Sequence, residues 1–192
     1  MPRRISLLLV TASQKTAESI TSAVPADRFA PIRTAPCAGE AKREMLARPC
    51  DIVVIDAPLP DDSGIRLATD LSECDVAGIL LLVKPEQYDA AFEKAFECGV
   101  MVLPTPLNPG ALNQALGLLA AAAVKLRKMA DRAETLQAKM DEIRLVNRAK
   151  LLLVEKLRMT EAEAHRFIEK SAMDRCEKRC QIAENIIRTY DN

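Results

Sequence analysis

Short apolar runs alternate with amphipathic stretches over roughly the first hundred residues of the chain. Residues 5–10 (ISLLLV) are too few for a helix and are bounded by polar residues, so they predict a buried strand. Residues 51–55 (DIVVI) give the clearest strand signal and end at Asp56. The predicted strands are residues 5–10, 29–34, 51–55, 78–83 and 100–103, and the predicted helices between them are residues 15–24, 38–47, 65–71 and 87–97.

This alternation predicts the fold of the N-terminal part. Repeated strand–helix units of this size indicate a doubly wound α/β domain, with a parallel five-stranded sheet covered by helices on both faces. In open sheets of this kind, binding and chemistry gather at the carboxyl ends of the strands. Asp56 follows one such end, so it is the first candidate for a functional residue.

From Pro109 onward no strand pattern returns, and the sequence is rich in Ala, Leu, Lys, Glu and Arg. One long helix is the simplest interpretation. Its apolar residues alternate at spacings of three and four, which predicts a two-stranded coiled coil and therefore a homodimer. A long helix packed on its own N-terminal domain is the alternative. The predicted seam consists of Leu119, Ala122, Leu126, Met129, Ala133, Leu136, Met140 and Ile143.

A second apolar pattern begins at Val146 and continues beyond a break at residues 157–160. Thr160 with Glu163 three residues later is typical of a capping box at a helix start. That helix is expected to run to about Ala172, and a last helix is expected at residues 176–189. The residues expected to face inward are Ala164, Phe167 and Ile168 on the first of these helices, and Cys180, Ile182, Ala183, Ile186 and Ile187 on the second.

Three expected domains follow from these patterns. They are a sheet domain at residues 1–118, a coiled-coil helix at residues 119–143 and a small three-helix bundle at residues 144–192.

The formal net charge is zero, but residues 1–124 carry 11 basic and 15 acidic side chains, and residues 125–192 carry 16 basic and 12 acidic ones. The positive excess of the C-terminal part is compatible with a nucleic-acid partner. Aromatic residues make up only 3% of the chain, which argues against RNA readers that stack bases on a sheet.

The six cysteines follow no paired spacing, which favours reduced thiols over a disulfide framework. Cys176 and Cys180 are four residues apart and are expected to share a helix face, but there is a single histidine, so no metal site is predicted.

The N-terminal apolar run covers only residues 5–10, too few for a signal peptide or a membrane span. We therefore expect a cytoplasmic protein with no membrane partner.

The loop that begins at Asp56 and contains Pro58 and Gly64 resembles the phosphoacceptor loop of response-regulator receivers. The resemblance covers about residues 3–120 and implies a receiver-like, flavodoxin-like domain with Asp56 at the phosphoacceptor position. It also implies a sensor kinase or another signalling protein as a partner.

Receivers also need an acidic pair for Mg²⁺, a hydroxyl after the fourth strand and a lysine after the fifth. Thr11 and Ala12 replace the acidic pair, Val83 replaces the hydroxyl, and Thr105 replaces the lysine. These groups compensate the charge of a phosphoaspartate. Without them we expect a pseudo-receiver that needs no Mg²⁺ or other cofactor and is not phosphorylated in the ordinary way.

Residues 147–154 (NRAKLLLV), 159–168 (MTEAEAHRFI) and 170–175 (KSAMDR), followed by Ile182 and Ala183, resemble the ANTAR domain. The resemblance spans about residues 140–190. It implies a dimeric, RNA-binding regulator of two-component type that recognises paired hairpins in a leader transcript and promotes transcription antitermination.

The same segment is rich in cations that could meet a phosphate backbone. Acidic residues are interleaved with them, so a solvated face of helical ion pairs is the alternative interpretation. The candidate RNA-binding residues are Arg148, Lys150, His165, Arg166, Lys170, Arg175, Lys178 and Arg179.

Two other function classes stay open. A three-helix unit can also bind DNA, although Glu161 and Glu163 begin its second helix and would repel phosphates. The chain could instead be a protein-interaction adaptor whose receiver-like half docks a kinase. Enzymatic activity is not expected, because the sequence has no glycine-rich phosphate loop and no nucleophile–histidine or metal-ligand pattern.

Overall fold

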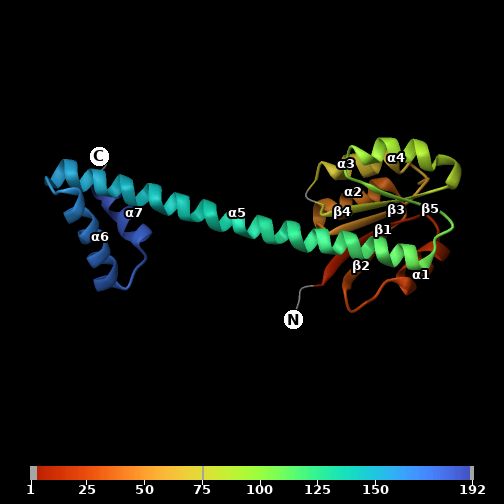
Figure 1. The fold of residues 1–192 in the computed structure, drawn as a ribbon, viewed down its shortest axis with the longest axis horizontal. Coiled ribbons are helices and arrows are strands. Elements are labelled where there is room, and N and C mark those ends of the chain that lie inside the picture. The colour runs from red at the N-terminus through yellow and green to blue at the C-terminus, as the bar shows by residue number, and fades with distance from the viewer. Residues whose placement is uncertain (1–3, 75, 191–192) are drawn as a thin grey trace. The chain divides into compact units, whose positions relative to one another are not determined.

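The computed structural model of the protein describes residues 4–74 and 76–190. Its N-terminal unit is built on a parallel five-stranded sheet with the strand order β2-β1-β3-β4-β5 (Figure 1). This confirms the predicted doubly wound architecture. The strands are β1 (Ile5–Val10), β2 (Phe29–Ala35), β3 (Ile52–Asp56), β4 (Gly78–Val83) and β5 (Met101–Pro104).

The central strands are apolar on both faces, because helices cover both sides of the sheet. All six residues of β4 are buried, and the first four residues of β3 are buried. Val10 pairs with Ile55 in the register of β1 and β3. The carboxyl ends of these two strands therefore lie side by side, which brings Thr11 next to Asp56.

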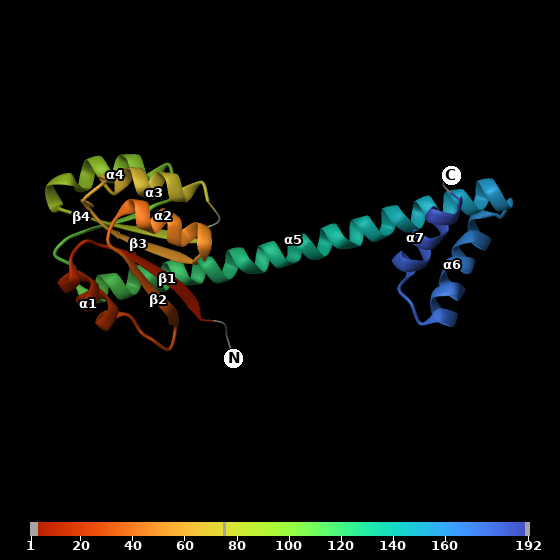
Figure 2. The ribbon, with the colours of Figure 1, turned by 180° about the vertical axis from the view of Figure 1, so that it is seen from behind.

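Helices lie on the two faces of the sheet in different sets (Figures 1 and 2). On one face the core is formed with α2, α3 and α4. On the other face α1 and the first turns of α5 pack on the strands. The bounds are α1 (Gln14–Ala23), α2 (Ala38–Ala47), α3 (Ile65–Ser72), the short 3₁₀ helix η1 (Pro85–Gln87), α4 (Tyr88–Phe96) and α5 (Pro109–Leu157).

The first turns of α5 belong to the core of the N-terminal unit. Leu116 and Leu119 are buried against the sheet, and Arg127 forms an ion pair with Asp51 just before β3. The prediction that Leu119 belongs to the coiled-coil seam is therefore wrong, because this side chain packs in the core of its own N-terminal unit. The compact N-terminal unit ends at Arg127, inside the segment expected to be the coiled coil.

Beyond Arg127, α5 presents apolar side chains that the chain itself does not cover. Their exposed fractions lie between 50% and 62% for Met129, Leu136, Met140 and Ile143. With the exposed Ala133 between Met129 and Leu136, these residues keep the spacing of three and four, so a narrow apolar stripe is exposed on this helix. We call Leu126, Met129, Leu136, Met140 and Ile143 the α5 stripe.

The C-terminal unit combines the last turns of α5 with α6 (Glu161–Arg175) and α7 (Arg179–Tyr190). The predicted capping box is confirmed, because Thr160 Oγ1 accepts from the Glu163 N–H and the Glu163 carboxylate accepts from the Thr160 N–H. The buried core of this unit consists of Ala149, Leu153, Ala164, Ile168, Ala172, Ile182, Ala183 and Ile186.

Two details of these helices differ from the prediction. Phe167 is 43% exposed. The buried face of α6 is formed by residues spaced four apart, such as Ala164 and Ile168, and Phe167 lies at the edge of that face. Cys176 adopts a left-handed conformation (φ 53°) and caps α6, so α7 begins only at Arg179. Cys176 and Cys180 therefore do not share a helix face.

Within residues 4–74 and 76–190, no helix is both long and apolar enough to cross a membrane.

Candidate functional site

Asp56 is the last residue of the central strand β3, at the carboxyl-terminal end of the sheet, and its side chain is hydrogen-bonded. Thr11 Oγ1 donates to Asp56 Oδ2 at 2.8 Å, and the Ser13 backbone N–H donates to Thr11 Oγ1 at 3.1 Å. Thr11 is only 6% exposed and occupies a position where receivers carry an acid. A neutral hydroxyl therefore contacts the carboxylate at a place where a receiver would hold a metal ion.

The two acids of the following loop are also engaged in local structure. Asp61 accepts from the backbone N–H groups of Ala38 and Gly39 at 2.8 and 2.9 Å. These two hydrogen bonds lower the pKa of Asp61 below its usual value, and the one from Gly39 has the larger effect. Asp62 accepts from the Gly64 N–H at 2.7 Å. Both carboxylates thus anchor the loop and the start of α2.

The resemblance to receivers singles out two further positions, Val83 and Thr105. Val83 is buried and apolar. Thr105 Oγ1 donates to the Val83 carbonyl oxygen at 3.2 Å, so its hydroxyl is used within the fold. Among the residues that the structure describes, no group of three His, Cys, Asp or Glu side chains could hold a metal ion. Within the part of the chain that the structure describes, Asp56 accepts a hydrogen bond from Thr11 and forms no ion pair.

The second candidate site is a groove in the C-terminal unit. Its volume is about 410 Å³, and it is formed between the end of α5 and the helices α6 and α7. We call it the α5–α7 groove. It is lined by Lys139, Glu142, Ile143, Val146, Asn147, Lys150, His165 and Arg179.

The groove brings together three of the eight predicted RNA-binding residues. Lys150 comes from α5, His165 from α6, and Arg179 is the first residue of α7. The other five do not line it: Arg148 lies on α5, Arg166, Lys170 and Arg175 lie on α6, and Lys178 lies just before α7.

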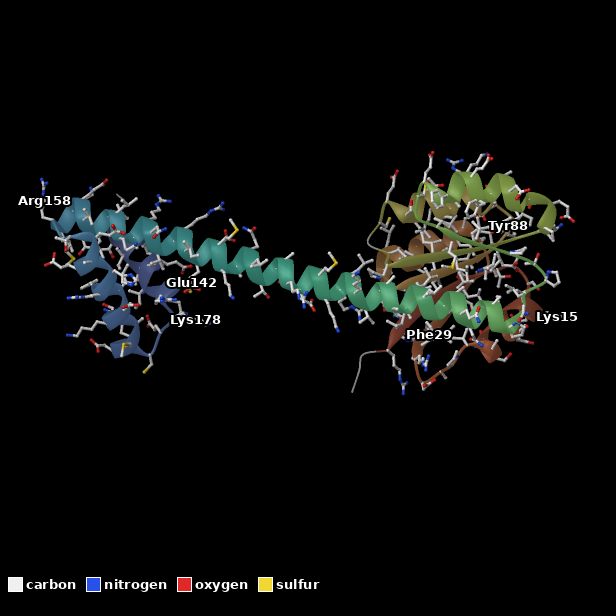
Figure 3. The ribbon with its side chains drawn as sticks, in the orientation of Figure 1. Lys15, Phe29, Tyr88, Glu142, Arg158 and Lys178 are labelled. Atoms are coloured by element: carbon white, nitrogen blue, oxygen red, sulfur yellow. The ribbon has the colours of Figure 1, made fainter. Side chains whose placement is uncertain are left out.

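Three basic side chains of the groove lie beside carboxylates. The Arg179 guanidinium lies 3.6 Å from Glu142 and 3.9 Å from Glu169. Figure 3 shows Glu142 on α5 and Lys178 near the start of α7. His165 Nε2 lies 3.4 Å from Glu169, and Lys150 Nζ lies 3.0 Å from Glu161. These pairs are at least partly exposed, so each contributes little to stability and can exchange partners.

Sequence reasoning missed Lys139 and Asn147 as site residues. Lys139, Ile143, Val146 and Lys150 follow one another at spacings of three and four, which places them on one face of α5. This spacing was a usable signal. It was hidden because Ile143 also fits the end of the predicted seam.

Comparisons with known proteins agree with both halves of the structure. The sequence model of the ANTAR domain matches residues 134–187, which include the whole groove. The transcriptional regulatory protein PdtaR of Mycobacterium tuberculosis is 31% identical over 140 residues, covering 72% of this chain and 68% of PdtaR.

Solved structures resemble the N-terminal unit in fold. A signal receiver domain of an HD-domain-containing protein from Pseudomonas fluorescens has a TM-score of 0.60 at 21% identity and covers 67% of this chain and 95% of that one. A CheY-like receiver domain protein from Methanospirillum hungatei has a TM-score of 0.58 at 15% identity and covers 64% of this chain and 98% of that one. With a receiver fold, an ANTAR segment and this similarity to PdtaR, the chain belongs to the family of ANTAR response regulators.

Proposed function

We propose that this chain is an RNA-binding regulator of transcription antitermination that acts as a dimer on paired hairpins of a leader transcript. The observation that carries the proposal is the α5–α7 groove, a cluster of cations inside the segment that matches the ANTAR domain. Cations that exchange weak carboxylate partners are suited to a phosphate backbone, where binding releases condensed counterions. Binding to a nascent transcript would also place the protein in the cytoplasm.

The dimer is proposed to form through the α5 stripe. Its residues are half or more exposed and repeat at the spacing of a coiled-coil seam. A seam of this kind would hold two ANTAR units together, as recognition of two hairpins requires. The limits of the domains at residues 118 and 143 stay predictions.

The receiver-like unit is proposed to act without ordinary phosphorylation. Thr11 binds Asp56 where a metal-binding acid is needed, and neither Val83 nor Thr105 offers the groups that neutralise an acyl phosphate. Control of the output would then come from a sensor kinase or another signalling protein that docks on this unit.

A mobility-shift titration tests the proposal. The full-length chain is titrated at low salt into an RNA with two hairpins, with and without acetyl phosphate. We expect the same binding in both conditions, and an affinity that falls steeply as salt rises. Failure to bind such an RNA in both conditions would remove the proposed function.

A further inference from the structure

Helix α4 of the N-terminal unit carries a row of aromatic side chains that the chain leaves largely uncovered. Tyr88 begins the helix (Figure 3), and Phe92 and Phe96 follow at a spacing of four. The ring centroids of Tyr88 and Phe92 lie 5.9 Å apart, and those of Phe92 and Phe96 lie 5.6 Å apart. Phe92 is 42% exposed and Phe96 is 70% exposed. Adjoining apolar side chains at the surface of a soluble domain indicate a contact surface, and aromatic rings contribute strongly to binding at such surfaces.

A row of acidic side chains lies beside the aromatic row on the same helix. Asp89, Glu93 and Glu97 each follow one of the rings by one residue, and all three are exposed. Residues four apart share a helix face, so the two rows run side by side along α4. Within the described part of the chain, none of the three carboxylates forms an ion pair. Ala91 and Ala95 are buried in the core, so the helix is fixed by its third side and presents both rows to solvent.

This pattern selects the chemistry of a partner. A helix with an apolar stripe can pack on the rings, and Lys or Arg side chains beside that stripe can pair with the carboxylates. An Arg guanidinium is also attracted to the face of an exposed Phe ring. RNA and anionic lipid headgroups are disfavoured, because the same carboxylates repel phosphates. Residues 1–124 have four more acidic than basic side chains, which adds long-range attraction for a cationic partner.

We propose that this surface docks a cationic amphipathic helix of another signalling protein. The proposal rests on the proposed function, because it names where the protein that controls the output binds and how it is recognised. Docking of this kind uses apolar contact and charge, and therefore requires no phosphoryl group on Asp56. We call it the α4 surface, and it consists of Tyr88, Asp89, Phe92, Glu93, Phe96 and Glu97.

A single tryptophan in the α4 surface tests the docking. The sequence contains no Trp, so Phe96→Trp places one fluorophore there in the full-length chain and keeps an aromatic ring at the position. The chain is titrated with synthetic helical peptides that share one leucine stripe and carry Lys, Gln or Glu beside it. In the same background, Glu93→Gln with Glu97→Gln removes two charges of the surface. Glu18→Gln with Glu73→Gln removes two exposed charges elsewhere on the unit and is the matched control.

We expect the Lys peptide to shift the Trp emission to shorter wavelength with a saturable dependence, and to bind about tenfold more tightly than the Gln peptide. The Glu93→Gln, Glu97→Gln chain should lose about that factor, and the control pair should change the affinity less than about twofold. Equal binding of the Lys and Glu peptides, equal effects of the two charge pairs, or no emission shift with any peptide would each overturn the proposal.

Two further readings separate this docking from its rivals. If the emission shifts with the concentration of the chain itself before any peptide is added, the α4 surface is an interface between copies, and the assigned partner is wrong. RNA binding by the Phe96→Trp chain is measured on the same samples. A chain that docks the Lys peptide but binds no two-hairpin RNA would keep the α4 surface and remove the proposed function, while a chain that binds RNA but no peptide would do the reverse.

Discussion

At the scale of single residues, Asp51 links the long helix to the sheet. Partial burial of the Asp51 carboxyl opposes its ionisation, but hydrogen bonds from the Ser6 N–H and hydroxyl and the guanidinium of Arg127 outweigh it and lower its pKa. A lowered pKa in the folded state stabilises the fold above the pKa of the unfolded chain, about 3.9 for Asp. This contribution is lost as the pH falls through the lower, folded-state value.

We therefore expect Asp51→Asn to lower the free energy of unfolding at pH 7 by about 2 kcal/mol. The difference from the wild type should shrink as the pH falls below about 4, because the unfolded carboxyl takes up a proton there while the folded one, with its lowered pKa, stays ionised until the pH is lower still. Urea unfolding at pH 7 and pH 3 measures both values. Asp89→Asn, an exposed acid on α4, serves as control, and an Asp51→Asn deficit of equal size at both pH values would contradict the expected linkage.

Under the proposed function, Glu142 would compete with RNA for Arg179, from which it lies 3.6 Å away. Glu142→Gln should tighten RNA binding about threefold at low salt, because a negative charge near the phosphates is removed. Glu155→Gln makes the same change of net charge at an exposed site that does not line the groove. Fluorescence anisotropy with labelled RNA compares the variants, and equal tightening by both would show that only net charge matters.

At the scale of elements, the strands and helices of the N-terminal unit were predictable, because short apolar runs and amphipathic stretches each have one stable arrangement in a layered sheet. The burial of Leu119 was not, since a seam residue and a core residue look alike in sequence. The late start of α7 at Arg179 also escaped prediction, because no Gly or Pro marks the left-handed residue Cys176. The groove could not be predicted from the sequence, because Lys150, His165 and Arg179 come from three different helices and meet only in the folded C-terminal unit.

A charged residue in the α5 stripe should leave the stability of the single chain nearly unchanged but should weaken the dimer. Leu136 is 62% exposed, so Leu136→Glu should change the stability of a single chain by less than about 0.5 kcal/mol. It should weaken dimerisation by tenfold or more, because it would place a charge inside the apolar seam.

Sedimentation velocity over a dilution series measures this effect. Thr135→Glu introduces the same charge at the neighbouring exposed position, which is not part of the seam. Equal association of wild type and Leu136→Glu would remove the stripe as the dimer interface.

At the scale of the whole molecule, charge is divided between the two halves of the chain. Residues 1–124 have four more acidic than basic side chains, and residues 125–192 have four more basic than acidic ones. This division suits a chain whose C-terminal unit binds a polyanion and whose N-terminal unit does not.

The most direct measurement is the mass of the complex formed by the full-length chain and an RNA that carries two hairpins, obtained by sedimentation with labelled RNA. We expect a dimer in the absence of RNA, a complex of two chains with one such RNA, and much weaker binding when one hairpin is deleted. A protein that stays monomeric at micromolar concentrations and does not sediment with either RNA would contradict a dimeric hairpin-binding regulator.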